Sequence, residues 1–264
     1  MKILLLSDLH TEFTNNTYPI PQVDCDVIVL AGDIGISLNG IKLANKWQEE
    51  LNVPIVIING NHEYYRNSSI SSTCGYMTIF EEMHFNQKVH CNKNVHFLEN
   101  DSVIINGVRF IGCTLWTDFR TDEKLTQEQE MYQAKRFLND YRICYYKQGK
   151  LLTPQDTLDM HNKSKKWLDK ELKKQFDGKT VIVTHHSPIL EGTNPIYLGD
   201  KNGGFCNVMD NFIKKHRNSI EAWFFGHTHY SVDFDLHSVK MVSNQCGYPS
   251  ERIDGFKDNK IIEV

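Results

Sequence analysis

The chain has 264 residues, of which 40% are hydrophobic and 23% charged, and its formal net charge is -4 at pH 7. These values are typical of a soluble globular protein, and no stretch approaches the roughly 18 apolar residues of a membrane span. The acidic balance also lacks the basic surface of a protein that binds long nucleic acids. The seven cysteines are scattered without a CxxC pair, which indicates reduced thiols and a cytoplasmic location.

Five short apolar runs rich in Val, Ile and Leu are typical of strands that are buried on both faces. They are KILLL (2–6), DVIVLA (26–31), PIVIIN (54–59), TVIVT (180–184) and EAWFF (221–225). We interpret the first run, at the start of the chain, as a strand rather than a signal peptide, because no small-residue cleavage site follows it. Two further segments, 102–112 and 231–243, alternate like hairpins, so the sheets are expected to be mixed.

Helical patterns lie between these strands. Apolar residues recur at helical spacing over 39–51, which predicts an amphipathic helix. Thr153, Pro154 and Asp156 have the positions of an N-cap, a first-turn proline and a capping partner of a later helix. Alternation of strands and helices predicts an α/β fold.

Each of the five apolar runs is followed at once by Asp, Asn or His, in the segments SDLH (7–10), GDIG (32–35), GNHE (60–63), HHSP (185–188) and GHTH (226–229). In α/β sheets, sites are built outside the carboxyl ends of the strands. Asp8 and His10 are two residues apart, as are His227 and His229, so each pair would point to one side of an extended backbone. Any one segment alone is typical of a turn, but five together predict a site.

The ordered blocks D-x-H, GD, GNH[DE], a His after a strand, and GHxH resemble the signature of calcineurin-like metallophosphoesterases over nearly the whole chain. Further segments, GNHEYY, TLWTDF, NDYRI, VTHHSP and NQCGYP, are similar to an uncharacterised bacterial and phage branch of that superfamily. The resemblance implies a single domain over 1–264, in which two mixed β-sheets pack as a sandwich flanked by helices.

The resemblance also implies a site for two divalent metal ions. The implied ligands are Asp8, His10 and His229 for one ion, Asn61, His185 and His227 for the other, and Asp33 as a bridge. Carboxylate, imidazole and amide ligands without a thiolate suit Mn, Fe, Zn or Ni, and so much imidazole disfavours calcium. Two such ions would hold a bridging hydroxide as the expected nucleophile for in-line attack on phosphorus.

His62 lies between the implied ligand Asn61 and Glu63. The family assigns this histidine to the leaving-group side, as a general acid or as a donor to the phosphoryl oxygens, and a pKa near neutrality suits either task. The alternative is that it only supports the ligand shell. His186 should point to the other side of its strand from His185, and we expect it to be structural.

The sequence departs from the Ser/Thr protein phosphatases, whose GDxxDRG block is replaced here by GDIGISLNG. The phosphate-binding arginine of that block has no counterpart, which disfavours protein phosphatase activity. Arg66 and Arg142 could take its place, or could be ordinary surface residues. The segment from about 115 to 176 is expected to be a helical insertion that could act as a lid, and the Gly-rich loop 190–205 a mobile rim.

The leading hypothesis is a dinuclear metal-dependent phosphoesterase for a small phosphorylated substrate, which could be a phosphomonoester, a phosphodiester or a nucleotide-derived pyrophosphate. One alternative is a non-catalytic scaffold that binds a protein partner, but such a scaffold would be expected to lose ligands that this chain retains. Another is a nuclease that acts on short nucleic acids, since a dinucleotide would fit without a long basic patch. The sequence leaves the oligomeric state open.

Overall fold

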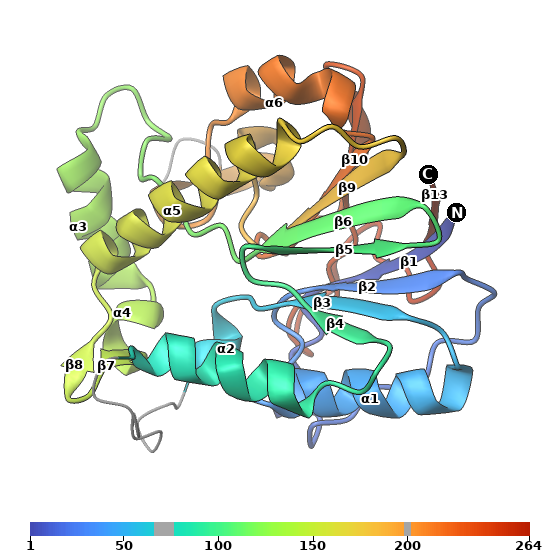
Figure 1. The fold of residues 1–264 in the computed structure, drawn as a ribbon. Helices are drawn as coiled ribbons and strands as arrows, with labels where there is room; N and C mark the ends of the chain where they lie inside the picture. The colour runs from blue at the N-terminus through green and yellow to red at the C-terminus, as the bar shows by residue number, and fades with distance from the viewer. Residues whose placement is uncertain (66–76, 198–201) are drawn as a thin grey trace.

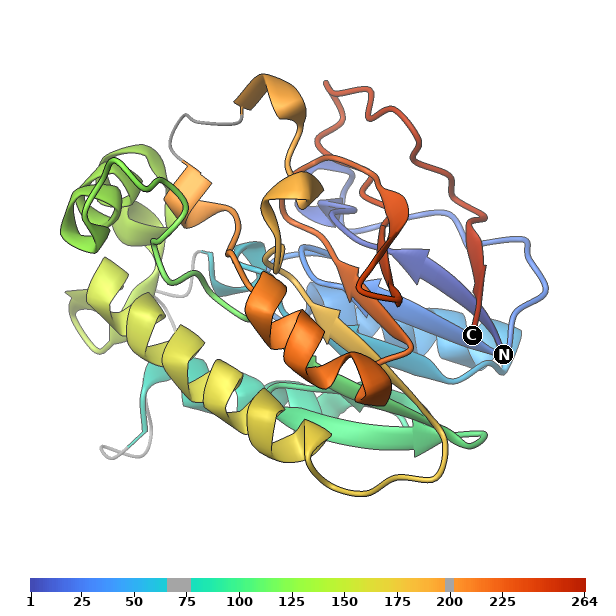
Figure 2. The same cartoon turned by 90° about the horizontal axis from the view of Figure 1, so that it is seen from above.

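The structure is a computed structural model that describes residues 1–65, 77–197 and 202–264. Two β-sheets stack face to face, and helices cover the outer face of each sheet (Figure 1). This arrangement confirms the predicted α/β sandwich of two mixed sheets. The view from above shows the N- and C-termini side by side at one edge (Figure 2), where β1 and β13 pair.

The first sheet has five strands in the order β13-β1-β2-β3-β4. Its members are β1 (Lys2–Leu6), β2 (Val27–Ala31), β3 (Ile55–Ile58), β4 (Val95–Phe97) and β13 (Ile261–Glu263). The four strands from β1 to β4 are parallel, and β13 runs antiparallel to β1. The carboxyl ends of β1, β2 and β3 therefore lie at one edge of the molecule.

The second sheet has six strands in the order β11-β12-β10-β9-β6-β5. Its members are β5 (Asp101–Ile105), β6 (Val108–Cys113), β9 (Lys179–Thr184), β10 (Ala222–Phe225), β11 (Asp233–Leu236) and β12 (Val239–Ser243). The four central strands are parallel, and β5 and β11 run antiparallel at the two edges. Both predicted hairpins, β5–β6 and β11–β12, are confirmed.

Helices α1 (Asn39–Leu51) and α2 (Ile79–His90) lie below the first sheet, and α5 (Pro154–Leu172) and α6 (Asp210–His216) lie above the second (Figure 1). The predicted cap of α5 is present, because the Thr153 side chain accepts from the backbone N–H of Asp156. Short 3₁₀ helices occupy Thr11–Phe13, His62–Tyr64, Leu190–Gly192, Pro195–Tyr197, Asn202–Gly204 and Arg217–Ser219.

The alternation of side chains along β1 explains how the layers are held together. Ile3 and Leu5 point into a buried cluster between the two sheets, whereas Leu4 and Leu6 belong to a second cluster that includes Trp47 of α1. Because both faces of the strand are buried, the run is apolar without interruption, as the sequence predicts. Burial of these side chains removes apolar surface from water and stabilises the sandwich.

The insertion contains α3 (Gln127–Phe137), α4 (Asp140–Ile143), the short hairpin of β7 (Tyr145–Lys147) and β8 (Lys150–Leu151), and α5. Its residues Trp116, Tyr141 and Leu158 share a hydrophobic cluster with Tyr64 and with Phe80 of α2. The other end of α5 packs Leu168 and Leu172 against the second sheet. That the chain is one domain, and that this insertion moves as a lid, stay predictions. None of the helices described is both long and apolar enough to cross a membrane.

Candidate metal centre

The polar segments that follow β1, β2, β3, β9 and β10 converge where the two sheets meet. Their side chains form three overlapping groups in which one nitrogen or oxygen atom of each residue lies within 4.8 Å of the others. The groups are Asp8, His10 and His229; His10, Asp33 and His62; and Asp33, His185 and His227. His10 and Asp33 are each shared by two groups, so these two residues join the three groups into one cluster.

The geometric premise that the Asp8–His10 and His227–His229 pairs lie on extended backbone is wrong. β1 ends at Leu6 and β10 ends at Phe225, so both pairs lie in the loops beyond the strands. All four residues have left-handed φ angles, between 46° and 75°. The backbone N–H groups of Asp8 and His10 donate to the carbonyls of Gly32 and Asp33, both at 3.0 Å. These bonds hold a backbone conformation that is unfavourable for residues with a side chain, as is common at functional sites.

Glycines let the loops approach each other closely. A Cβ atom on Gly60 would lie 2.1 Å from Oδ1 of Asp33, and one on Gly226 would lie 2.6 Å from Oδ2 of Asp8. Either contact is far shorter than van der Waals separation. The absence of a side chain at these two positions is therefore required for the carboxylates to occupy their places.

The imidazoles of His10 and His229 direct lone pairs at each other. Nδ1 of His10 donates to Glu12 at 3.2 Å, and Nδ1 of His229 donates to Glu251 at 2.5 Å, because a carboxylate can only accept. The two Nε2 atoms face each other at 3.0 Å. In the neutral rings neither Nε2 carries a proton, so the pair requires a cation or a proton between them. Histidines that bind a metal through one ring nitrogen typically donate from the other ring nitrogen to a carboxylate, as both Nδ1 atoms do here.

In His185, as in His10 and His229, Nδ1 is the hydrogen-bond donor and Nε2 faces the other proposed ligands. Nδ1 of His185 donates to the Ala31 carbonyl at 3.0 Å, which in the neutral ring leaves a lone pair on Nε2. That Nε2 lies 3.1 Å from both Oδ1 of Asn61 and Nδ1 of His227. The other nitrogen of His227 is buried and has no hydrogen-bond partner among the residues described. Several electron-pair donors thus point into one small volume.

Buried negative charge supports the same conclusion. Asp8, Asp33, Glu63 and Asp140 are all buried, and in the described parts of the chain none of them forms an ion pair with Lys or Arg. Burial alone would raise the pKa of Asp33, but the neighbouring imidazoles of His185 and His62 lower it well below its usual value. Buried carboxylates that have no Lys or Arg partner are costly to the fold. The donor set is therefore consistent with two divalent cations.

Glu63 has a role that the sequence did not reveal. Its carboxylate accepts from the backbone N–H groups of Asp33, Ile34, Gly35 and Gly60, at 3.0, 2.8, 3.3 and 2.7 Å. It thereby ties the loop after β2 to the loop after β3. Its position in the GNHE block was a signal, but the motif alone does not say whether the carboxylate faces a ligand or the backbone.

His62 lies between two polar partners that were also missed. Nδ1 donates to Oε1 of Glu12 at 2.7 Å, and Nε2 lies 3.2 Å from the hydroxyl of Tyr248. Burial would raise the pKa of Glu12, but hydrogen bonds from His10 and His62 lower it to about 2. Burial would lower the pKa of His62, and the charge of Asp33 followed by the bond to Glu12 raises it to about 9. The bond to Glu12 thus fixes Nδ1 of His62, while Nε2 is directed at the cavity.

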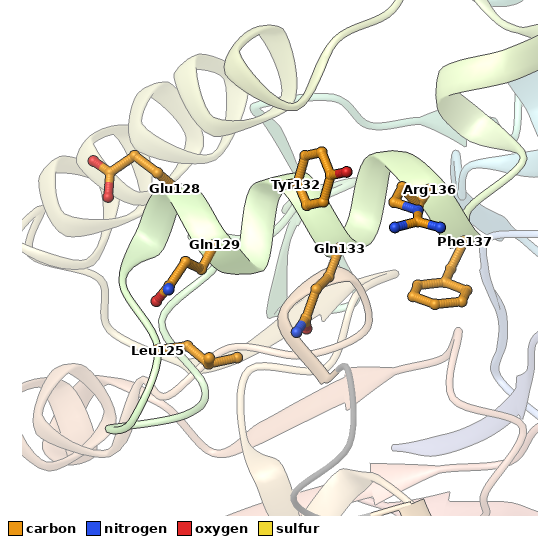
Figure 3. A pocket seen from close by; sticks show the side chains of 7 residues that line it. All are labelled: Leu125, Glu128, Gln129, Tyr132, Gln133, Arg136 and Phe137. Atoms are coloured by element: carbon orange, nitrogen blue, oxygen red, sulfur yellow. The ribbon is translucent and has the colours of Figure 1, made fainter.

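A cavity of 510 Å³ opens beside these residues. Its lining includes the polar residues Asp33, Asn61, His62, His227 and His229 and the apolar residues Phe137, Leu138 and Phe205. Phe137 also borders a shallow groove along α3, where Gln129, Gln133 and Phe137 point to the same side of the helix (Figure 3). The insertion thus forms part of the wall of the cavity.

The remaining predicted residues are placed as follows. Arg142 is exposed, and its guanidinium donates to the backbone carbonyl of Arg136, so it does not face the cluster. Arg66 lies outside the described residues, as does part of the loop 190–205. Thr193 of that loop lines the cavity. His186 is buried, with Nδ1 3.2 Å from the Thr114 carbonyl.

Comparisons with known proteins agree with this geometry. Residues 1–231 match the family described as calcineurin-like phosphoesterase. An uncharacterised protein of Acanthamoeba polyphaga mimivirus, L509, is 26% identical over 280 residues, which cover 96% of this chain and 93% of that protein. The crystal structure of phosphopantetheinyl hydrolase (PptH) from Mycobacterium tuberculosis has a TM-score of 0.67 at 14% identity, covering 94% of this chain and 90% of that one. At this identity the structural likeness concerns the fold alone.

Proposed function

The chain belongs to the calcineurin-like phosphoesterase family, and we propose that it is a dinuclear metal-dependent hydrolase of a small phosphomonoester or phosphodiester. One observation carries the proposal. Imidazole nitrogens and buried carboxylates converge on one small volume, and among the described residues these carboxylates have no Lys or Arg partner. A scaffold protein would gain nothing from burying such a set, because each uncompensated charge destabilises the fold.

The proposed ligands form two sets joined by one carboxylate. Asp8, His10 and His229 hold one ion, Asn61, His185 and His227 hold the other, and Asp33 contacts both. Mn, Fe, Zn and Ni suit this mixture of imidazole and oxygen ligands. When bound, two such ions supply Lewis-acid stabilisation of phosphoryl oxygens and lower the pKa of an attacking water.

The side chains of this protein supply the remaining functions. Glu12 accepts from Nδ1 of His62 and so fixes the ring with Nε2 toward the cavity. We assign to that nitrogen the transfer of a proton to the leaving oxygen, or a hydrogen bond to a phosphoryl oxygen. The hydroxyl of Tyr248 lies within hydrogen-bond reach of the same nitrogen and can hold it in place before substrate enters.

The cavity favours a substrate with one phosphoryl group and an uncharged organic part. Phe137, Leu138, Phe205 and Ile253 provide apolar surface, and the described lining residues include Glu251 but no Lys or Arg. Such a wall would repel the extra charges of a pyrophosphate or a longer polyanion. A dinucleotide, with one backbone charge and stacking bases, fits the same requirements, so a nuclease for very short substrates is the second candidate.

The test is hydrolysis by metal-stripped protein of p-nitrophenyl phosphate and of bis(p-nitrophenyl) phosphate, with Mn, Ni, Zn, Mg or Ca added back singly. We expect turnover to return with a transition metal and not with Ca. The ratio of monoester to diester rates then selects the substrates to try next. If no metal binds and no ester is cleaved, the proposal is wrong and the scaffold hypothesis replaces it.

A further inference from the structure

One carboxylate of the insertion, that of Asp140, forms a hydrogen bond with the proposed metal ligand Asn61. Asp140 is the first residue of α4, is buried, and stands 79 positions after Asn61 in the chain. Its Oδ1 accepts from the amide Nδ2 of Asn61 at 2.8 Å and from the hydroxyl of Tyr65 at 2.8 Å. The same Nδ2 lies 3.1 Å from the Tyr65 hydroxyl. Both protons of the Asn61 amide therefore have acceptors.

The hydrogen bonds among Asn61, Tyr65 and Asp140 determine which end of the Asn61 amide faces the metal centre. An ionised carboxylate accepts but cannot donate, so Oδ1 of Asn61 could not take the place of Nδ2 beside Asp140 without repulsion between two acceptors. The amide oxygen is consequently turned toward Nε2 of His185, at 3.1 Å. Without an acceptor at the position of Asp140, the two ends of the amide could exchange, and a nitrogen in place of the oxygen cannot bind a cation.

We propose that Asp140 is a positioning residue that holds the Asn61 amide with its oxygen toward the second metal ion, so that the insertion is a structural part of the metal centre. This inference rests on the proposed function, because it takes Asn61 as a ligand. Residues that orient metal ligands typically change metal affinity about 10- to 100-fold when they are removed.

The energetics of Asp140 support a role beyond packing. A buried carboxylate without a cationic partner destabilises a protein, and an apolar side chain of similar size would usually be more favourable there. Its second oxygen has no hydrogen-bond partner among the described residues. Two divalent ions beside Asn61 would compensate this charge, whereas a purely structural site would leave it unpaired.

Tyr141 provides a control on the same helix. It is buried, and its hydroxyl lies 3.0 Å from Oγ1 of Thr157 on α5, which anchors α4 in the insertion. It does not hydrogen-bond to Asn61 in the structure. Removal of this hydroxyl should therefore loosen α4 to a similar degree without changing the acceptors of the Asn61 amide.

The experiment is calorimetric titration of the metal-stripped full-length protein with MnCl₂ or ZnCl₂. We compare wild type, Asp140→Ala, Asp140→Asn, Tyr65→Phe and Tyr141→Phe. Asp140→Ala should weaken one of two binding events about 10- to 100-fold and leave the other unchanged. Asp140→Asn and Tyr65→Phe should each lose less, since each keeps an acceptor oxygen at position 140 for the amide of Asn61. Tyr141→Phe should bind both ions as wild type does.

The outcomes separate the two proposals. Two unchanged binding events in Asp140→Ala, with wild type also binding two ions, would overturn the role of Asp140 and leave the proposed function standing. Equal losses in Asp140→Ala and Tyr141→Phe would also overturn it, because they would indicate general loosening of α4. Failure of the wild type to bind any metal would instead remove the proposed function. If Asp140→Ala does not fold, Asp140→Asn and Tyr65→Phe against Tyr141→Phe decide the question.

Discussion

The strand-end loops and the insertion contribute to the same cavity in different ways. The loops after β1, β2 and β10 hold Asp8, Asp33 and His227 in left-handed backbone conformations, with glycines that permit almost no additional atom. The insertion has ordinary helices that share a hydrophobic cluster with α2, and it reaches the centre through Asp140 and the wall residue Phe137. The loops thus supply donors to metal, and the insertion supplies orientation and shape.

Substitutions in the two regions should therefore have different effects. A change among the strand-end donors should remove metal and activity together, because no other residue can replace a missing ligand. A change among the supporting acids should reduce the reaction by a smaller factor. A change at a buried residue of the insertion that does not contact the proposed ligands should affect stability before chemistry. Four predictions test this order, from the largest effect to the smallest.

Asp33→Asn should have the largest effect, because Asp33 lies in donor groups with both His10 and His185 and is the proposed ligand of both ions. We expect both metal sites to weaken and turnover to fall to background. Metal content by atomic emission and hydrolysis of p-nitrophenyl phosphate measure the two effects. Retention of two ions with full activity would refute the bridging position.

His62→Ala should keep both metals and lower kcat about 10²- to 10⁴-fold, the range for loss of a general acid. The loss should be greater for phenyl phosphate than for p-nitrophenyl phosphate, because a poor leaving group depends more on a proton donor. Steady-state kinetics on both esters measure it. Equal losses on the two substrates would favour the hydrogen-bonding role instead.

Glu12→Gln should lower kcat about 10-fold, since the carboxylate that holds His62 and His10 loses its charge while its shape is kept. Glu251→Gln is the matched control, because Glu251 holds the ring of His229 and does not contact His62. Only Glu12→Gln should increase the dependence on leaving-group pKa. The same change in both variants would show that neither acid acts through His62.

His161→Gln should affect only the pH dependence of stability. His161 is buried in α5, and its Nδ1 donates to the Trp116 carbonyl at 2.7 Å. Burial lowers the pKa of His161. The charge of Asp118 opposes this shift, and the charge of Lys165 adds to it. Below the unfolded pKa of about 6.5, the unfolded state binds the proton more readily, so stability falls as the pH falls.

Urea unfolding at pH 7.5 and pH 5 measures this effect on metal-free protein. The wild type should lose more stability on acidification than His161→Gln, whose side-chain amide can still donate to Trp116. The rate of hydrolysis at pH 7.5 should be the same in both. A pH dependence that is identical in the two proteins would show that His161 is neutral or charged alike in the folded and unfolded states.

Much of this protein could be predicted from sequence because its signals are local. Apolar runs predicted β1 over Lys2–Leu6 and α1 over Asn39–Leu51, and the capping pattern at Thr153 placed the start of α5. The polar residues after the strands had to meet, since parallel strands bring their carboxyl ends to one edge. Residue types and order therefore determined the fold class and the candidate donors.

The tertiary structure alone decided how those donors are aimed. Extended alternation wrongly explained the Asp8–His10 pair, because hydrogen bonds between neighbouring loops, rather than the strand, set its backbone angles. Glu12, Glu251, Tyr248 and Asp140 had no periodic signal, and NDYRI drew attention to Arg142 although Asp140 is the residue that points inward. Hydrogen bonds between residues 79 or 186 positions apart depend on how the elements pack in space, and a local pattern cannot encode that.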